Sequence, residues 1–292
     1  MRSAQRQTPT SGLTRDVQPD ELAAYWRDGA AIVRGILPLD WIDALREATE
    51  ELMADPATPG MDFAAGDGPR FFTLTYGWRY HRTFAEWALR GPLIDLSRQV
   101  LPGARTLTHF FDQIFAREAG ATKQTPFHQD QPYSPATEPD HYFRHWVPLD
   151  VVTAQSGAVR YLRGSHRGPT YRARSFDADN AVASLYDNAE YFEVLPDFEA
   201  TYDDHDWLVG EVEPGDVILH HPGTVHGTLS ATEAVPRRAI TNVYADELVR
   251  WAPHPGDGFQ NEALMGHQPM PDLSPGDLLA CDLFPEVWSA AD

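Results

Sequence analysis

Short β-rich runs dominate the chain from about residue 105 onward, and they strongly limit the folds that it can adopt. They are rich in aliphatic and aromatic residues and are bounded by Pro, Gly or Asp, and the clearest cover residues 107–115, 142–152, 158–162, 216–220 and 238–244. Such a succession is typical of the antiparallel strands of a sandwich or barrel. We therefore predict a mainly β protein with a barrel core over about residues 105–246.

Helical periodicity is confined to the N-terminal third of the chain. A first helix is expected to begin at Pro19, and a second begins near Pro38 and runs to about Met53 with its apolar residues on one face. A short apolar strand, residues 30–33, lies between them, and a third helix is expected over about residues 83–100. We expect these flanking helices to buttress the barrel.

No repeat, low-complexity tract or linker divides the chain. We therefore predict one domain over residues 16–292, preceded by a flexible tail over residues 1–15. Residues 55–80 and 170–210 break the regular pattern with prolines, acidic residues and aromatic residues, which favours lid segments or a wall facing a substrate. The aromatic and proline-containing stretch 250–292 is expected to pack across the barrel or at an oligomer interface, and both a monomer and a homo-oligomer fit the sequence.

Charge and cysteine content narrow the partners and the compartment. The net charge is −20, so an acidic surface would repel nucleic acids and anionic membranes, and neither is an expected partner. Cys281 is the single cysteine, which excludes an intramolecular disulfide and a cysteine-based zinc cluster and fits a reducing compartment. The sequence has neither an apolar run long enough to span a bilayer nor a signal-peptide pattern, and we expect a cytoplasmic protein.

A His-x-Asp pair is the first feature that predicts chemistry. His128 and Asp130 lie in the segment Thr125-Pro-Phe-His-Gln-Asp-Gln131. If this segment is a strand, side chains two residues apart point to the same face, so an imidazole nitrogen and a carboxylate oxygen would enter the barrel together. Two donors make only one edge of a metal site, and a third must come from elsewhere.

The third donor is expected from the block that ends in His226-Gly227. There a Pro-Gly-Asp turn at residues 214–216 leads into an apolar strand, and a second turn delivers His226. Two histidines and one carboxylate on one face of iron(II) leave three positions open for substrates, unlike a four-ligand structural zinc site. Eleven residues later, Arg237 can grip a carboxylate through two parallel hydrogen bonds, and the Thr228 hydroxyl can add a donor from the same side.

Several alternatives remain open at this point. His220 and His221 compete with His226 as the distant ligand, although either also fits a packed histidine near the end of the apolar strand. Arg238 replaces Arg237 if the strand faces the other way. A further set of histidines is expected on the surface or around the ligands, namely His109, His141 and His145.

In these motifs the sequence resembles the phytanoyl-CoA dioxygenase family, a branch of the iron(II)- and 2-oxoglutarate-dependent oxygenases. The resemblance extends from the first helix to about Tyr244, and its most specific parts are residues 125–133, Arg163-Gly-Ser-His166, residues 214–227 and Pro236-Arg-Arg-Ala239. Similar proteins often have Trp in place of Phe127 and Pro in place of Arg163. Neither difference affects a predicted ligand.

The resemblance implies a double-stranded β-helix, the jelly-roll barrel of cupin-like proteins, with Fe(II) at its open end. By the same route His128, Asp130 and His226 match the iron ligands, and Arg237 matches the anchor of the co-substrate 2-oxoglutarate. Trp146 matches a strand residue near that pocket, Gln113 is a further pocket residue, and the turn at 164–166 is structural. O₂ would be the second co-substrate. Similar halogenases replace the carboxylate ligand by a small residue, so Asp130 favours hydroxylation or a related oxidation.

We therefore predict an oxygenase that hydroxylates a small-molecule or natural-product substrate of secondary metabolism and releases succinate and CO₂. An acyl-CoA hydroxylase with the same chemistry is an alternative, because five arginines between residues 160 and 174 could meet phosphates, although they can equally pair with surface carboxylates. A metal-dependent hydrolase or isomerase on a similar barrel, which would need no 2-oxo acid, is a second alternative. A binding protein without catalysis is the third.

Overall fold

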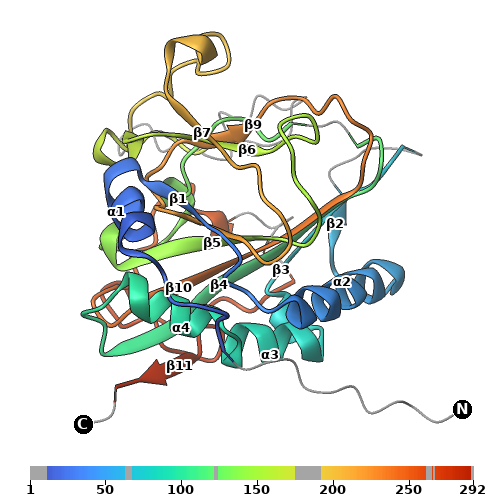
Figure 1. The fold of residues 1–292 in the computed structure, drawn as a ribbon. Coiled ribbons are helices and arrows are strands. Elements are labelled where there is room, and N and C mark those ends of the chain that lie inside the picture. Colours follow the sequence, from blue (N-terminus) through green and yellow to red (C-terminus); the bar gives the residue numbers. More distant parts are fainter. Residues whose placement is uncertain are drawn as a thin grey trace, which may run out of the picture.

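Two antiparallel sheets of unequal size form the β part of the molecule. The computed structural model describes residues 12–62, 68–121, 124–174, 192–260, 265 and 267–290. The large sheet has the strand order β1-β8-β5-β10-β4-β3-β2, with β11 also paired to β4, and the small sheet has the order β7-β6-β9. Figure 1 shows the small sheet stacked over the large one. The prediction of a mainly β protein with antiparallel strands is confirmed.

The strands follow the β-rich runs of the sequence closely. Their bounds are Ala30–Val33 (β1), Met61–Asp62 (β2), Phe71–Thr75 (β3), Thr106–Arg117 (β4), Tyr142–Pro148 (β5), Val159–Leu162 (β6), Trp207–Val209 (β7), Val217–His220 (β8), His226–Thr228 (β9), Arg237–Asp246 (β10) and Glu286–Ser289 (β11). The long strands β4 and β10 pair along almost their whole length, from Arg237 opposite Arg117 to Asp246 opposite Leu107. They form the centre of the large sheet.

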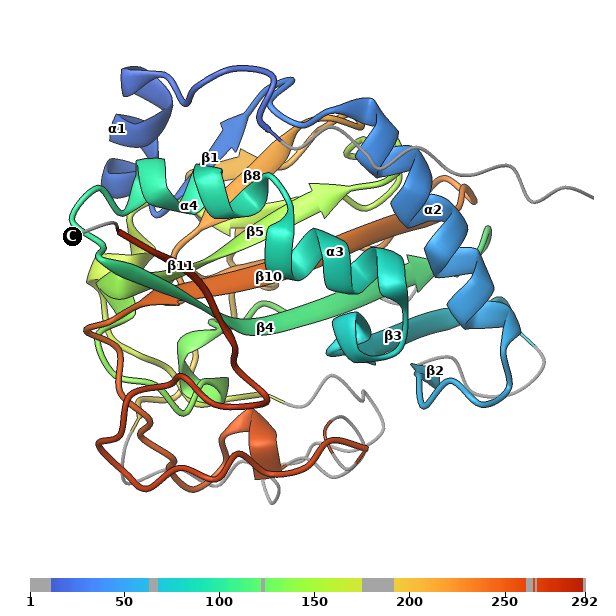
Figure 2. The ribbon, with the colours of Figure 1, turned by 90° about the horizontal axis from the view of Figure 1, so that it is seen from below.

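Helices cover the face of the large sheet that points away from the small sheet. Their bounds are Pro19–Asp28 (α1), Leu39–Ala54 (α2), Arg82–Arg90 (α3) and Leu93–Val100 (α4), with short 3₁₀ turns at Gly77–Arg79 (η1), Gln131–Tyr133 (η2), Pro139–His141 (η3), Ser165–Arg167 (η4), Tyr202–Asp204 (η5) and Gly258–Gln260 (η6). In Figure 2, α2, α3 and α4 lie across the strands, and α1 lies at the β1 edge. Two polar anchors reinforce the apolar packing, because Trp87 Nε1 donates to Asn242 Oδ1 (2.8 Å) and Tyr244 Oη donates to Ala88 O (2.8 Å). The other face of the sheet is therefore left for the pocket.

The third predicted helix is wrong as one continuous element. The chain forms α3 and α4 with a break at Gly91-Pro92. A Cβ at Gly91 would lie 2.3 Å from the carbonyl oxygen of Trp87, and Pro92 has no N–H to continue the helical ladder. The two residues therefore end one helix and start the next.

Part of the segment predicted as a substrate-facing wall or lid, residues 55–80, belongs to the large sheet. Residues Phe71–Thr75 form β3, which is buried throughout and paired to β4 from Phe71 opposite Arg117 to Thr75 opposite Gln113. The Pro- and Gly-rich composition ends at residue 70, and the aromatic and β-branched run after it favours a strand. Residues 63–67, residues 175–191 of the second predicted lid and residues 1–11 of the predicted tail lie outside the described residues.

The C-terminal stretch packs against the edge of the pocket. Trp251, Leu283 and Phe284 join a buried cluster with Phe110 and Tyr142 of β4 and β5, and β11 pairs with the start of β4. This stretch therefore contributes to the same core as the strands.

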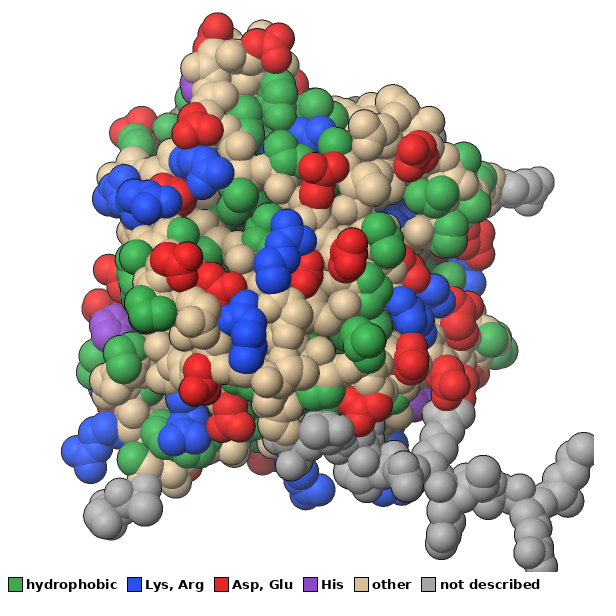
Figure 3. All heavy atoms as spheres, viewed as in Figure 1, with side chains coloured by type: hydrophobic (Ala, Val, Ile, Leu, Met, Phe, Trp, Pro, Cys, Tyr) green, Lys and Arg blue, Asp and Glu red, His purple; other side chains and the backbone are tan. Residues whose placement is uncertain are grey.

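Acidic and basic side chains are interspersed over the face of the molecule drawn in Figure 3, within a chain whose net charge is −20. Across the described ranges, no helix combines the length and the apolar character that crossing a bilayer requires.

Candidate metal centre and its pocket

His128 and His226 meet through a short backbone contact between two chain segments. Each residue donates its N–H to the carbonyl of the other, at 2.9 Å and 2.8 Å, which forms an isolated antiparallel bridge. His226 is the first residue of β9. The backbone thus holds the two imidazoles side by side, with ring centroids 4.2 Å apart.

The Asp130 side chain lies beside the two histidines, but a turn places it there and not the predicted strand. The expected strand through residues 128–130 is wrong, because His128 makes only a single bridge and Asp130 has a helical backbone conformation (φ −81°, ψ −28°). The N–H groups of Asp130 and Gln131 both donate to the carbonyl of Pro222, at 2.9 Å each. This turn, rather than strand alternation, brings the carboxylate to the histidines.

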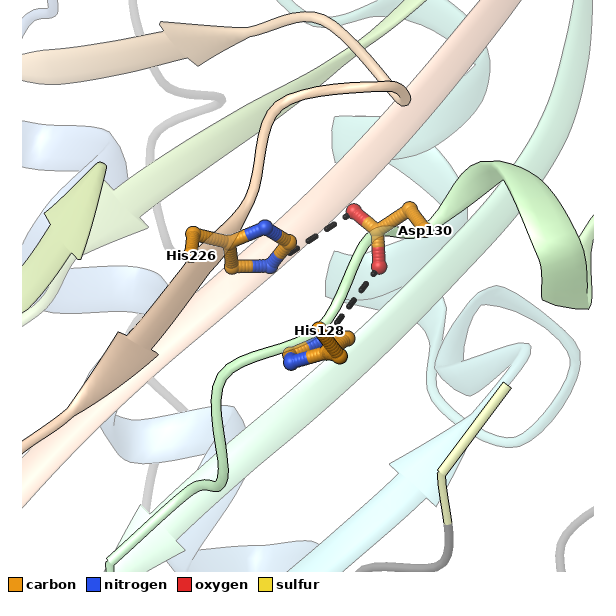
Figure 4. A group of neighbouring side chains, drawn as sticks. All are labelled: His128, Asp130 and His226. Carbon is orange, nitrogen blue, oxygen red and sulfur yellow. Dashed lines mark ion pairs between the residues drawn. The ribbon is translucent and has the colours of Figure 1, made fainter. Parts of the chain in front are cut away.

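The three side chains form a compact set of donor atoms (Figure 4). His128 Nε2 lies 3.7 Å from Asp130 Oδ1, and His226 Nε2 lies 3.8 Å from Asp130 Oδ2. All three donor atoms lie within 4.8 Å of one another, and all three residues are buried. Two atoms that are each about 2.1 Å from one metal ion lie at most about 4.2 Å apart, so small side-chain movements would let the set bind an ion.

Both imidazoles are oriented for metal binding by backbone carbonyls. His128 Nδ1 lies 2.8 Å from Pro126 O, and His226 Nδ1 lies 2.9 Å from Thr224 O. Because a carbonyl only accepts, each Nδ1 carries the proton and each Nε2 presents a lone pair toward Asp130. This is the tautomer that a metal ion needs.

Arg144, which the sequence did not single out, and His220, one of the alternatives to His226, hold the carboxylate of Asp130. Arg144 Nε of β5 lies 2.6 Å from Asp130 Oδ2, and His220 Nε2 at the end of β8 lies 3.0 Å from the same oxygen. Burial opposes the ionisation of Asp130, but the charge of Arg144 and the neighbouring imidazoles hold its pKa well below its usual range. The aspartate is therefore ionised, with Oδ1 facing His128.

The alternatives to His226 make other contacts and do not replace it in the donor set. His220 donates to Asp130, and His221 Nε2 contacts Asp140 Oδ1 at 2.9 Å. Neither belongs to the cluster of donor atoms found among the described residues, which consists of His128, Asp130 and His226.

Of the three histidines expected on the surface or around the ligands, two are not on the surface. His109 and His145 are fully buried under the helices, where His145 Nδ1 contacts Asn242 O at 3.1 Å. His141 is half-buried and contacts Asp246 Oδ2 at 2.7 Å.

The predicted co-substrate residues line one pocket of about 190 Å³ together with the metal-ligand candidates. The pocket residues that the sequence singled out are Gln113, Trp146, Thr228 and Arg237. Thr228 Oγ1 accepts from Thr125 N (2.8 Å), and Gln113 Nε2 donates to Thr73 Oγ1 (2.8 Å). The two sheets therefore contribute to the same cavity.

Arg237 and its neighbour Arg238 point to opposite faces of β10. Arg237 is buried, its guanidinium donates to Gly157 O, and burial lowers its pKa to about 10. Arg238 lies outside the pocket lining and pairs with Asp150 (2.7 Å) and Glu50 (2.6 Å). Of the two, only Arg237 is available to an anion in the pocket.

The remaining pocket wall is mostly aromatic. It includes Phe71, Phe110, Phe111, Phe115, Tyr133, Tyr142, Phe143, Tyr161 and Phe259. Two further arginines, Arg117 and Arg144, also line it. The period-two alternation of residues 111, 113, 115 and 117 along β4 is the sequence signal that could have placed Arg117 beside Gln113.

Comparison with known proteins identifies relatives among dioxygenases. The sequence model of the family described as phytanoyl-CoA dioxygenase matches residues 25–239. A probable alpha-ketoglutarate-dependent hypophosphite dioxygenase of Stutzerimonas stutzeri is 29% identical over 153 residues, which are 52% of this chain and 49% of that protein. A probable phytanoyl-CoA dioxygenase of Caenorhabditis elegans is 27% identical over 132 residues, 44% of this chain and 39% of that protein. The matches thus span about half or less of the curated relatives.

Solved structures show the same fold. The non-heme alpha-ketoglutarate-dependent carbocyclase SnoK from nogalamycin biosynthesis aligns with a TM-score of 0.69 and 24% identity over 97% of this chain and 100% of that one. The family match covers most of the chain and includes His128, Asp130, His226 and Arg237. The chain belongs to the phytanoyl-CoA dioxygenase family of iron(II)- and 2-oxoglutarate-dependent oxygenases.

Proposed function

We propose that the protein is an Fe(II)- and 2-oxoglutarate-dependent oxygenase that hydroxylates a small molecule and releases succinate and CO₂. The observation that carries the proposal is the placement of two Nε2 lone pairs, an ionised carboxylate and a buried arginine in one pocket. A hydrolase or isomerase with the same three ligands would need no 2-oxo acid, and Arg237 would then have no co-substrate carboxylate to bind. The family match supports the same reaction class.

The residues present fit the proposed iron and its co-substrate. His128, Asp130 and His226 would hold Fe(II), which supplies the activation of O₂ when bound. Arg237 would bind the distal carboxylate of 2-oxoglutarate, with Thr228, Trp146 and Gln113 around the rest of that molecule. Arg144 and His220 keep Asp130 ionised and oriented. We further infer that the two stacked sheets are the two halves of a double-stranded β-helix.

The substrate that we propose is a largely apolar, ring-containing small molecule of secondary metabolism. Aromatic side chains form most of the pocket wall, and such walls bind flat apolar ligands by stacking and burial. One similar structure, the epimerase SnoN, is described in complex with Fe³⁺, alpha-ketoglutarate and nogalamycin RO, at a TM-score of 0.69 and 22% identity. That neighbour supports a small-molecule substrate.

The arginines near residues 160–174 do not favour an acyl-CoA. Arg163 pairs with Asp28 (2.6 Å), and Arg174 pairs with Glu199 (3.1 Å). Arg160 is buried and donates to Tyr202 Oη (2.9 Å) and Ala158 O (2.8 Å). Internal partners therefore occupy three of the five cations that an acyl-CoA phosphate could meet.

The test is the visible charge-transfer band that forms when a 2-oxo acid chelates Fe(II) in the absence of oxygen. We expect a band in the wild type and its loss in Asp130→Ala and His226→Ala. Arg237→Met should require roughly 10- to 100-fold more 2-oxoglutarate, because a charge-assisted hydrogen-bonded pair is lost. Arg238→Met is the matched control on the same strand, and its titration should follow the wild type.

A wild-type protein that binds metal but gives no band would favour the hydrolase or isomerase alternative. A succinate-release screen over ring-containing small molecules and acyl-CoAs, with Fe(II), ascorbate and O₂, then tests the substrate class. Turnover of acyl-CoAs alone would contradict the proposed class while leaving the reaction in place.

A further inference from the structure

Two buried arginines lie side by side on the adjacent strands β4 and β10 of the large sheet. Arg117 of β4 is the register partner of Arg237 of β10. Their exposed fractions are 5% and 7%, and both line the pocket. Two guanidinium groups are thus brought together where only one was predicted.

No carboxylate among the described residues neutralises this pair. The Arg117 guanidinium donates to Thr125 Oγ1 (3.0 Å) and lies over the Phe71 ring at 4.1 Å, while its Nε has no hydrogen-bond partner in the described part of the chain. Arg237 donates to the carbonyl of Gly157. In a chain with 43 acidic and 23 basic residues, two buried arginines without a carboxylate partner indicate a site for an anionic ligand.

The energetics of the pair point to the same conclusion. Burial lowers the pKa of both guanidiniums, and the charge of Arg237 lowers that of Arg117 further. Both groups nevertheless stay protonated near neutral pH. Like charges in a cavity are unfavourable together, and a bound carboxylate would relieve both the desolvation and the repulsion.

The surroundings indicate which part of the pocket the anion would occupy. Arg117 contacts Thr125, and the N–H of Thr125 donates to the hydroxyl of Thr228, two residues after His226. Arg117 therefore lies on the side of the pocket that holds Thr228 and Arg237. Arg144, the cation beside the metal-ligand candidates, is already paired with Asp130.

We propose that Arg117 and Arg237 together bind the distal carboxylate of 2-oxoglutarate, so that Arg117 is a second residue selecting a dicarboxylic 2-oxo acid. This proposal rests on the proposed function. Two guanidiniums can offer a carboxylate more donors than its two oxygens need, which fixes its position and disfavours 2-oxo acids with an apolar end.

The experiment compares two 2-oxo acids in the anaerobic Fe(II) charge-transfer titration. 2-Oxopentanoate has the same chain as 2-oxoglutarate, but a methyl group replaces the distal carboxylate. In Arg117→Met, we expect the preference for 2-oxoglutarate, measured as the ratio of the two dissociation constants, to fall roughly 10- to 100-fold. Arg117→Lys keeps the charge without the planar fork and should give an intermediate ratio.

Arg160→Met is the matched control, because Arg160 is equally buried (7% exposed) and lies outside the pocket lining. Its ratio should equal that of the wild type. Equal weakening of both acids in Arg117→Met would show a structural role and overturn the proposal. An unchanged ratio, with altered affinity for the primary substrate, would assign Arg117 to that substrate and overturn it as well.

Failure of the proposed function gives a different result. A wild-type protein that binds metal but forms no band with either acid would remove the basis of both proposals. A wild-type band whose ratio is insensitive to Arg117 would overturn only this one.

Discussion

Two buried aspartates of this chain are held in opposite ionisation states. Asp130 is ionised because Arg144 and the imidazoles compensate for its burial. Asp112 is on the opposite face of β4 from the pocket, and burial raises its pKa to about 8, while the nearby N–H groups of Gly77 and Trp78 lower it only in part. Its neighbour His109, with Nε2 3.5 Å from Asp112 Oδ1, has its pKa lowered to about 3 by burial. Asp112 and His109 are thus a neutral pair at neutral pH.

Replacing Asp112 by Asn should stabilise the protein, and increasingly so as the pH rises. In the unfolded chain Asp112 ionises near pH 4, whereas the folded protein holds it neutral up to about pH 8. The unfolding free energy of the wild type therefore falls as the pH rises between these two values. Asn does not titrate, so the variant keeps its stability over this range. The expected gain in unfolding free energy at pH 7 is on the order of a few kcal/mol. The measurement is the unfolding free energy of the variant minus that of the wild type, determined at several pH values from 5 to 8.

Asp43→Asn, at an exposed position of α2, is the control and should change stability little at any pH. A variant at position 112 that is less stable than the wild type throughout would mean that Asp112 is ionised in the fold.

At the scale of elements, the metal-ligand candidates depend on a close approach between β9 and the segment before Asp130. Gly227 follows His226 directly, and a Cβ there would lie 2.9 Å from the backbone N and Cα of Phe127. These are backbone atoms, so a side-chain rotation cannot relieve the contact. The glycine after the ligand is needed because the two segments pack backbone to backbone.

Gly227→Ala should therefore weaken metal binding. Moving β9 away from Phe127 strains the His128–His226 bridge, and loss of a ligand's support typically costs about 10- to 100-fold in metal affinity. The measurement is a titration with Fe(II) or a spectroscopic substitute under anaerobic conditions. Gly103→Ala is the control, because a Cβ at Gly103 meets nothing within 4 Å. Unchanged metal affinity in Gly227→Ala would show that the close approach is dispensable.

Much of the strand pattern could be predicted from the sequence because alternation and turn residues are local signals. The predicted run 107–115 became β4, and 238–244 became β10. The prediction failed where tertiary contacts decide the outcome. Asp130 reaches the site through two hydrogen bonds to Pro222, a residue remote in sequence.

For the site, too, local motifs could be predicted from the sequence and tertiary contacts could not. The motif spacing indicated the ligand set and Arg237, and the structure brings these side chains together. The sequence indicates His220 as an alternative ligand, but Arg144 could not be predicted as a partner of Asp130, because it comes to lie opposite His220 only when β5 pairs with β8. Arg117 likewise becomes significant only through its pairing with Arg237. The roles of these residues, and the prediction of one domain over residues 16–292, stay predictions.

At the scale of the whole molecule, the two faces of the large sheet differ in role. The helices pack on one face, and the candidate site lies on the face toward the small sheet. Helices α2, α3 and α4 cover one face (Figure 2). The pocket lies against the other, with Arg144, Arg117 and Arg237 inside it. A cationic interior is therefore enclosed by a chain whose net charge is −20.

This contrast has a consequence for the speed of binding. 2-Oxoglutarate is a dianion and must approach a molecule of its own charge sign before it meets the buried arginines. Salt screens that long-range repulsion, so the association rate constant should rise a few-fold between roughly 10 and 150 mM ionic strength, the reverse of electrostatic steering. Stopped-flow recording of the charge-transfer band measures it, and the monoanion 2-oxopentanoate should respond less. A rate that falls with salt would mean that the field at the pocket mouth is positive, and that the arginines attract their ligand from outside.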